Sequence, residues 1–125
     1  MTTISIVPTK ISRGSHKWVW ANMGDDDVGE ALGPDGGGIA FADKTVMIVA
    51  AAYDSATIAI QGSNDGSNWF TLTNPNNDSL SFTVGDQLDT ILENPLYIRP
   101  KTSGGQANPA DITVTLVGRA TLQLR

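Results

Sequence analysis

Residues 57–72 read TIAIQGSNDGSNWFTL and carry the signals of two strands and of the turn between them. Ile58 and Ile60 alternate with smaller residues, which is the pattern of a strand with one buried face. Asp65-Gly66 predicts the centre of the turn, because glycine adopts positive φ easily and aspartate bonds to nearby backbone. The alternation resumes from residue 69 to residue 72. This stretch therefore predicts a β-hairpin and, with it, an antiparallel β protein.

Similar strand signals recur along the chain between turns rich in glycine, proline and asparagine. They occupy residues 4–7, 16–23, 44–52, 80–84, 96–101, 111–117 and 122–124. The clearest alternation lies in residues 111–117, where we expect Ile112, Val114 and Leu116 to point inward. About eight strands at this spacing indicate an all-β fold, namely a single antiparallel β-sandwich of the jelly-roll or immunoglobulin-like kind.

Two segments depart from simple alternation. Residues 44–52 (KTVMIVAAA) are apolar almost throughout, which predicts a strand that is covered on both faces. Residues 87–93 place Leu88, Ile91 and Leu92 at helical spacing, which predicts one short helical turn before Pro95. We expect no other helix.

The composition of the 125-residue chain is that of one folded domain, residues 1–125. Its net charge of −5, with eight scattered basic residues, argues against nucleic-acid binding, which needs clustered Lys and Arg. Cysteine is absent, so neither a disulfide nor a thiolate metal site can form. No apolar run approaches membrane-spanning length, and the N-terminus lacks a signal-peptide pattern. We therefore expect a soluble protein, made in a cytoplasm, that binds neither nucleic acid nor membrane.

Two segments have weaker strand signals than the rest. Residues 1–13 are interrupted by Pro8 and predict an extended N-terminal arm. Residues 24–38, GDDDVGEALGPDGGG, predict a long acidic, glycine-rich surface loop. Its aspartates at 25–27 and Glu30 could supply oxygen ligands to a cation, but their spacing does not match the helix–loop–helix calcium site. A solvated acidic loop is the favoured interpretation.

No constellation of residues in the sequence predicts an enzyme. His16 is the only histidine and no serine lies in a Gly-x-Ser-x-Gly elbow, so a serine–histidine triad has no support. Glu30 and Glu93 are the only glutamates, and neither lies in a convincing catalytic pattern. The glycines at 36–38 do not connect a strand to a helix, as a phosphate-binding loop requires. We expect no catalytic activity, no cofactor and no metal.

The tryptophans allow two interpretations. Trp18 and Trp20 share one face of the strand expected at 16–23, together with Asn22. Such a face, with Trp69, could stack on sugar rings. Packing in a core or a subunit interface is commoner for large aromatic residues and is favoured.

Several segments of the chain resemble two known families. Residues 62–69, GSNDGSNW, resemble a recurring hairpin of discoidin-like jelly-roll modules, many of which bind carbohydrate or lipid. A longer resemblance is to small virion proteins of tailed bacteriophages, of the head decoration or cement kind. It runs in order through residues 18–43, 42–46 (ADKTV), 62–69, 92–100 (LENPLYIRP) and 112–116 (ITVTL).

The second resemblance implies a function. It implies a non-enzymatic protein that binds the major capsid protein on the virion surface and stabilises the capsid, often as a homotrimer. Residues 1–13 and 24–38 are then the expected grips on the shell. The large apolar residues expected at an interface are Ile4, Ile6, Trp18, Trp20, Phe41, Tyr53 and Tyr97. The alternative function is that of a carbohydrate-binding β-sandwich module.

Overall fold

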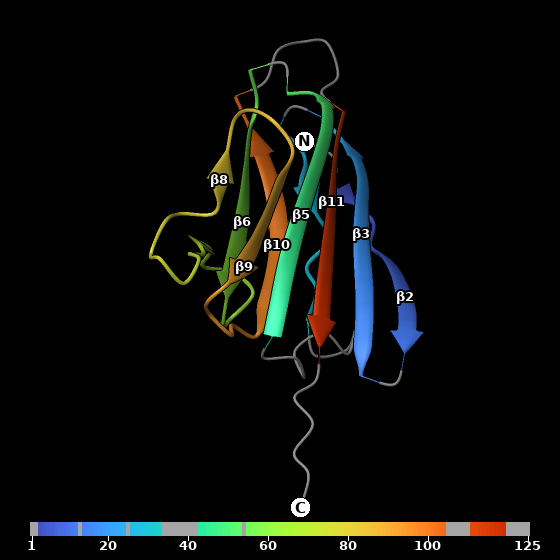
Figure 1. The fold of residues 1–125 in the computed structure, drawn as a ribbon. Coiled ribbons are helices and arrows are strands. Elements are labelled where there is room, and N and C mark those ends of the chain that lie inside the picture. The colour runs from blue at the N-terminus through green and yellow to red at the C-terminus, as the bar shows by residue number, and fades with distance from the viewer. Residues whose placement is uncertain are drawn as a thin grey trace, which may run out of the picture.

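Two β-sheets pack face to face in a computed structural model that describes residues 3–12, 14–24, 26–33, 43–53, 55–104 and 111–119 (Figure 1). Sheet A has the order β1 (Thr3–Ile4), β4 (Val28–Gly29), β10 (Tyr97–Ser103) and β6 (Thr57–Ser63), followed by β7 (Phe70–Thr71) and β8 (Ser81–Phe82), which both pair with β6. Sheet B has the order β2 (Val7–Ser12), β3 (Ser15–Met23), β11 (Asp111–Arg119), β5 (Asp43–Ala52) and β9 (Gln87–Ile91). Strands β1 and β4 are parallel, and the other pairs are antiparallel. The described residues contain no helix, and the predicted all-β sandwich is confirmed.

The predicted hairpin is present as β6 and β7, which pair through Gln61–Thr71 and Gly62–Phe70. The chain leaves the sheet after Leu72, whose N donates to Ile60 O at 2.8 Å. It returns at Leu80, whose carbonyl O accepts a hydrogen bond from Ile60 N at 2.9 Å. One edge of β6 is thus paired with two short strands, and the strand expected at 80–84 is reduced to β8.

The core between the sheets follows the predicted alternation. Ile112, Val114 and Leu116 of β11 are buried, as are Ile58 and Ile60 of β6. These side chains belong to a single hydrophobic cluster that joins the two sheets. Strands β6 and β11 therefore each contribute one face to the core.

Strands β5 and β9 differ from their predictions. In β5 only alternate residues are buried, so the expectation of a strand covered on both faces is wrong for the isolated chain. Residues 87–91 form β9 beside β5, which corrects the predicted helical turn. The open edge of β5 offers backbone hydrogen bonds to these residues, and burial of Ile91 needs only strand alternation. With several two-residue strands, the described part of the chain has eleven strands where about eight were expected.

Residues 3–12 are part of the sandwich, which corrects the prediction of an extended arm for this part of residues 1–13. Strand β1 pairs with β4, β2 pairs with β3, and Ile4 and Ile6 pack partly against the core. Pro8 lies in β2 at the edge of sheet B, a position that tolerates a missing N–H. In the predicted loop, residues 28–29 form β4. Phe41 and the strand expected at 122–124 lie outside the described residues.

Candidate functional site

On the outer face of sheet B, a row of uncharged side chains runs across all five strands. In spatial order they are Leu88, Met47, Thr115, Val19 and Val7, each paired with the next in the register of the sheet. We call these five residues the apolar row. Leu88 is 72% exposed, Val7 57% and Met47 41%. The row is therefore open to solvent over strands that lie side by side (Figure 1).

The neighbouring residues of this face are also mostly uncharged. A second register row consists of Thr90, Thr45, Val117, Lys17 and Thr9. Lys17 is the one charged residue in the two rows. Exposed apolar side chains gathered on one face are typical of protein interfaces. Another protein surface can cover this face with desolvation of few charged groups.

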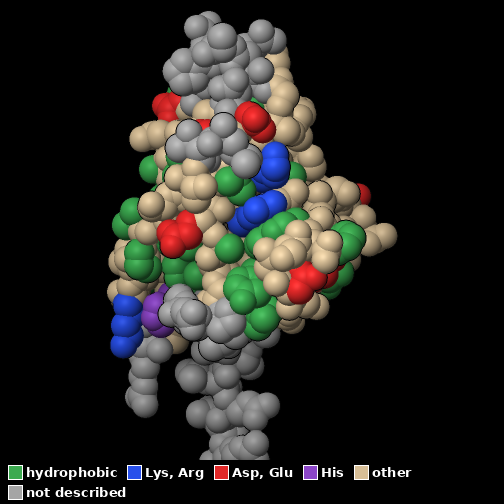
Figure 2. Space-filling model, turned by 180° about the vertical axis from the view of Figure 1, so that it is seen from behind, with side chains coloured by type: hydrophobic (Ala, Val, Ile, Leu, Met, Phe, Trp, Pro, Cys, Tyr) green, Lys and Arg blue, Asp and Glu red, His purple; other side chains and the backbone are tan. Residues whose placement is uncertain are grey.

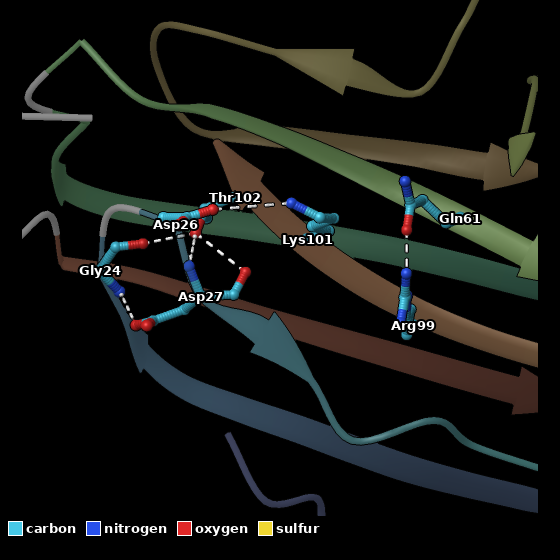
Figure 3. A network of polar contacts seen from close by, with 7 residues as sticks. All are labelled: Gly24, Asp26, Asp27, Gln61, Arg99, Lys101 and Thr102. Atoms are coloured by element: carbon cyan, nitrogen blue, oxygen red, sulfur yellow. Dashed lines mark hydrogen bonds and ion pairs between the residues drawn. The ribbon is translucent and has the colours of Figure 1, made fainter. Parts of the chain in front are cut away.

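The outer face of sheet A has basic and aromatic side chains instead. On the face seen in Figure 2, basic side chains lie beside a group of hydrophobic ones. Arg99 Cζ lies 4.0 Å from the centroid of the Trp69 ring. Arg99 Nε donates to Gln61 Oε1 at 3.0 Å, and these two residues are directly opposite each other in β10 and β6 (Figure 3). The cation–π contact and the hydrogen bond together fix the orientation of the guanidinium.

Tyr97 is half-buried on the same side of β10 as Arg99. A β-carbon at Gly33 would lie 2.5 Å from Tyr97 Cε1, and one at Gly66 would lie 3.7 Å from Tyr97 Cε2. The ring is therefore packed between the backbone that follows β4 and the turn of the hairpin. Its main contacts are within the chain.

Of the three aspartates that were candidate cation ligands, Asp25 lies outside the described residues, and Asp26 and Asp27 have separate partners (Figure 3). Asp26 Oδ1 lies 3.8 Å from Lys101 Nζ, whereas Asp27 Oδ2 accepts a hydrogen bond from Gly24 N at 2.7 Å. The buried Thr102 hydroxyl accepts from Asp27 N at 2.7 Å and donates to Gly24 O. In the described ranges, no group of three or more His, Cys, Asp or Glu residues is arranged to hold a metal. The hydrogen bonds instead attach Gly24 and Asp27 to β10.

Glu30, the other candidate ligand, joins three segments of the chain. Its Oε1 accepts a hydrogen bond from Ile6 N at 2.9 Å, and its N donates to Ile4 O at 2.7 Å. Its carbonyl O accepts from Trp20 Nε1 at 3.0 Å. That bond satisfies the indole N–H of a fully buried side chain.

Asp65 organises the hairpin turn that the sequence predicted. Its Oδ1 accepts from Ser67 N and Asn68 N, both at 2.8 Å, and its Oδ2 accepts from Asn68 Nδ2 at 2.7 Å. Ser63 Oγ donates to Asp65 Oδ1 at 2.9 Å, and Gly66 has a φ of 77°. The hydrogen bonds from Asn68 and Ser67 hold the pKa of Asp65 well below its usual range. These residues therefore stabilise the turn.

Lys44 is a buried charged residue whose Nζ donates to Asn94 Oδ1. Burial lowers the pKa of Lys44, and the charges of Asp43 and Glu93 act in the opposite direction. Glu93 accepts hydrogen bonds from Thr73 N at 2.9 Å and from Thr73 Oγ1. Burial acts to raise the pKa of Glu93, but the bonds from Thr73 and the charge of Lys44 outweigh it and lower that pKa. These contacts tie the ends of two loops to β5.

Of the residues predicted for an interface, two lie inside the domain, and the other described ones are partly exposed. Trp18 and Trp20 are 1% and 0% exposed, because both fill space between the sheets. Neither ring is open to a partner or to a sugar, which corrects that part of the prediction. The His16 ring stacks on Trp18, with centroids 5.8 Å apart. Tyr53 packs partly on the core and donates from its hydroxyl to Gly85 O.

Neither outer face was predicted from the sequence, although one signal was present. Residues 44–52 are apolar in both phases of the strand, so Met47 and Val49 remain exposed after Val46 and Ile48 are buried. That surplus of apolar residues is the sequence signal for an exposed apolar face on sheet B. The contact of Arg99 with Trp69 had no comparable signal, because it depends on the pairing of β10 with β6 and on the path of the hairpin.

The part of the chain that the structure describes has no helix long and apolar enough to cross a membrane. No protein-family model matches the sequence, and no curated protein is significantly similar to it.

Solved structures align with most of this chain. The SPBc2 prophage-derived protein YomS aligns with a TM-score of 0.58 and 12% identity, over 88% of this chain and 100% of that one. The K1 cleaved adhesin domain of Lys-gingipain (Kgp) from Porphyromonas gingivalis W83 aligns with a TM-score of 0.42 and 12% identity, over 94% of this chain and 85% of that one. At this identity, the similarity to YomS shows a shared fold.

Proposed function

We propose that this protein is a non-enzymatic structural protein of a bacteriophage virion. In this proposal it is made in the host cytoplasm, decorates the outside of the capsid and stabilises the lattice of the major capsid protein. The apolar row on the outer face of sheet B carries the proposal, because it offers a solvent-exposed contact across five paired strands.

Strand β5 explains why such a contact is expected. It buries Val46 and Ile48 in the core and leaves Met47 and Val49 on the opposite face. A strand with apolar residues on both faces is normally covered on both, and this sandwich covers one. Removal of apolar surface from water contributes about 25 cal/mol per Å². A capsid surface laid over β5 would supply the second cover.

Two further observations support this choice of partner. The fold is shared with a prophage-derived protein, and the sequence resembles capsid decoration proteins in several ordered segments. A protein that binds the assembled lattice more tightly than separate subunits shifts the equilibrium toward the intact shell. Such a role requires a binding surface and no reaction.

We further propose that the protein acts on the capsid as a homotrimer. The number of subunits rests on the family resemblance. Three identical contacts raise the apparent affinity without new chemistry, because the second and third contacts form within one complex. Sedimentation of the purified chain and imaging of decorated shells test this, and isolated single copies on the shell would contradict it.

Co-sedimentation with assembled shells tests the function. Met47→Glu places a carboxylate in the apolar row, and we expect it to abolish decoration because that charge would be buried without a partner. Its side chain points away from the core, so the fold is expected to persist. Val84→Glu is the matched control, since Val84 is 72% exposed and lies outside the row. Equal binding by both variants would overturn the role of the row.

Separate capsid subunits provide the second comparison. If the wild-type protein binds them as tightly as it binds shells, it cannot stabilise the assembled lattice by mass action. The alternative function, a carbohydrate-binding module, rested on Trp18, Trp20 and Trp69 and on the resemblance of residues 62–69 to discoidin-like modules. Of the three tryptophans, Trp18 and Trp20 are buried. A glycan array with the purified protein tests that function, and sugar binding would now have to involve Trp69, the half-buried tryptophan.

A further inference from the structure

The outer face of sheet A presents a guanidinium that is already oriented for a ligand. Arg99 is held by Gln61 Oε1 at 3.0 Å and lies 4.0 Å from the centroid of the Trp69 ring. Within the described ranges, no carboxylate forms an ion pair with it. Burial lowers the pKa of Arg99. A fixed guanidinium without an anionic partner is suited to a carboxylate from another molecule, which it can bind in a bidentate manner.

A second cation lies on the same face of the same strand. Lys101 follows Arg99 by two residues in β10, so the two positions are about 7 Å apart along the strand. The partner of Lys101 is Asp26, at 3.8 Å and with a side chain that is 65% exposed. Exposed ion pairs of this kind are weak, so an incoming carboxylate can replace Asp26. The two cations form a short basic strip in a chain whose net charge is −5.

The spacing of this strip selects one class of ligand. In an extended peptide, alternate side chains lie on one side and repeat every ~7 Å. Acidic residues at alternate positions would therefore place their carboxylates opposite Arg99 and Lys101. A sugar is disfavoured by the geometry, because stacking on Trp69 needs a bare aromatic face and the guanidinium covers one side of that ring.

We propose that the strip of Arg99 and Lys101 binds an extended, acidic segment of a partner protein through alternate carboxylates. This surface is separate from the apolar row and differs from it in chemistry, so the inference goes beyond the proposed capsid contact. Gln61 and Trp69 act as positioning residues for Arg99.

Titration followed by nuclear magnetic resonance of the full chain tests the proposal with a defined probe. The probe is the blocked peptide (Asp-Ser)₄, and (Asn-Ser)₄ is its uncharged match. We expect the acidic peptide alone to shift the Arg99 Nε–H and Trp69 indole signals. The Trp20 indole signal is an internal reference, because that group is bonded to Glu30 O within the domain.

Variants identify the binding groups. We expect Arg99→Gln to weaken peptide binding by about tenfold or more, since a charged hydrogen-bonded contact is lost. Arg99→Lys keeps the charge without the planar fork and is expected to bind with intermediate affinity. Lys101→Gln is expected to weaken binding independently. Lys10→Gln changes the net charge equally on the exposed edge strand β2 and is expected to leave binding unchanged.

Several results would overturn the proposal. Absence of any shift with (Asp-Ser)₄ would do so, as would equal affinity of Arg99→Gln and wild type. An equal loss in Lys10→Gln would show attraction by net charge alone. Binding of trigalacturonate in place of the acidic peptide would assign the site to an acidic glycan.

Discussion

Pro100 packs its ring against the backbone of Gly29, so closely that a β-carbon at Gly29 would lie 2.5 Å from Pro100 Cδ. Gly29 has no side chain, which leaves room for the proline ring in β10, a strand that lies between β4 and β6. Ile98 N donates to Leu32 O and Thr102 N donates to Asp27 O on the side of β4. Residue 100 lies between Ile98 and Thr102, so its nitrogen also faces the side of β4. The missing N–H of Pro100 therefore removes no hydrogen bond from the pairing with β6.

Gly29→Ala is therefore expected to lower the free energy of unfolding by about 1–3 kcal/mol, the usual range for an added methyl group in a packed site. The new β-carbon would also lie 2.8 Å from Trp20 Cδ1, so two rigid groups resist it. Urea denaturation measures the change. In a double-mutant cycle, Pro100→Ala removes Cγ and Cδ and is expected to recover part of the loss. Strict additivity would contradict a direct clash.

Much of the fold was predictable because burial on one face leaves a period of two in the sequence. The hairpin at 57–72 and the inward residues of β11 followed from that period and are confirmed. Strand β9 was mistaken for a helical turn, because three apolar residues in so short a segment fit either period and pairing with β5 decides between them. Asn22 was expected on the same face of β3 as Trp20. It has a φ of 56° at the point where the register of β3 shifts, and Met23 is the buried residue instead.

The candidate surfaces were harder to predict than the fold. An exposed apolar residue such as Met47 cannot be told from a buried one until the pairing and the second sheet are known. Trp18 and Trp20 were assigned to an interface because of their size, although a core of this kind has room for both. Arg99 and Trp69 meet only after the hairpin folds onto β10. Contacts between side chains of neighbouring strands depend on the register of pairing, and the amino-acid composition does not determine that register.

Thr102→Val tests how Gly24 and Asp27 are attached to β10. The Thr102 hydroxyl is fully buried and bonds both Asp27 N and Gly24 O. Valine keeps the shape but leaves these backbone groups without that partner, so we expect a loss of about 1–3 kcal/mol in the free energy of unfolding. Faster hydrogen exchange at the Asp27 amide would locate the effect. Thr71→Val on the exposed strand β7 is the matched control and is expected to change stability little.

Asp65→Asn tests the charge at the hairpin turn. The native pKa of Asp65 lies well below its value in the unfolded chain, because Asn68 and Ser67 donate hydrogen bonds to the carboxylate. Such a group stabilises the fold fully above the unfolded pKa, near 4, and loses that contribution as the pH falls toward the native pKa. We expect wild type to be more stable than Asp65→Asn at pH 7 and the difference to shrink below about pH 4. A difference that is constant from pH 7 to pH 3 would show that the charge plays no part.

Deletion of residues 1–13 distinguishes an arm that grips a partner from strands that belong to the sandwich. The deletion removes β1 and β2 together with the partly buried side chains of Ile4 and Ile6. Partial burial of two isoleucines contributes about 2–4 kcal/mol, so we expect a clear fall in the urea midpoint followed by tryptophan fluorescence. The double variant Ile4→Ser, Ile6→Ser keeps the chain length and is expected to reproduce most of that fall. If the truncated protein is as stable as the full chain but no longer binds shells, residues 1–13 act as a grip and their pairing in the sheets contributes little to stability.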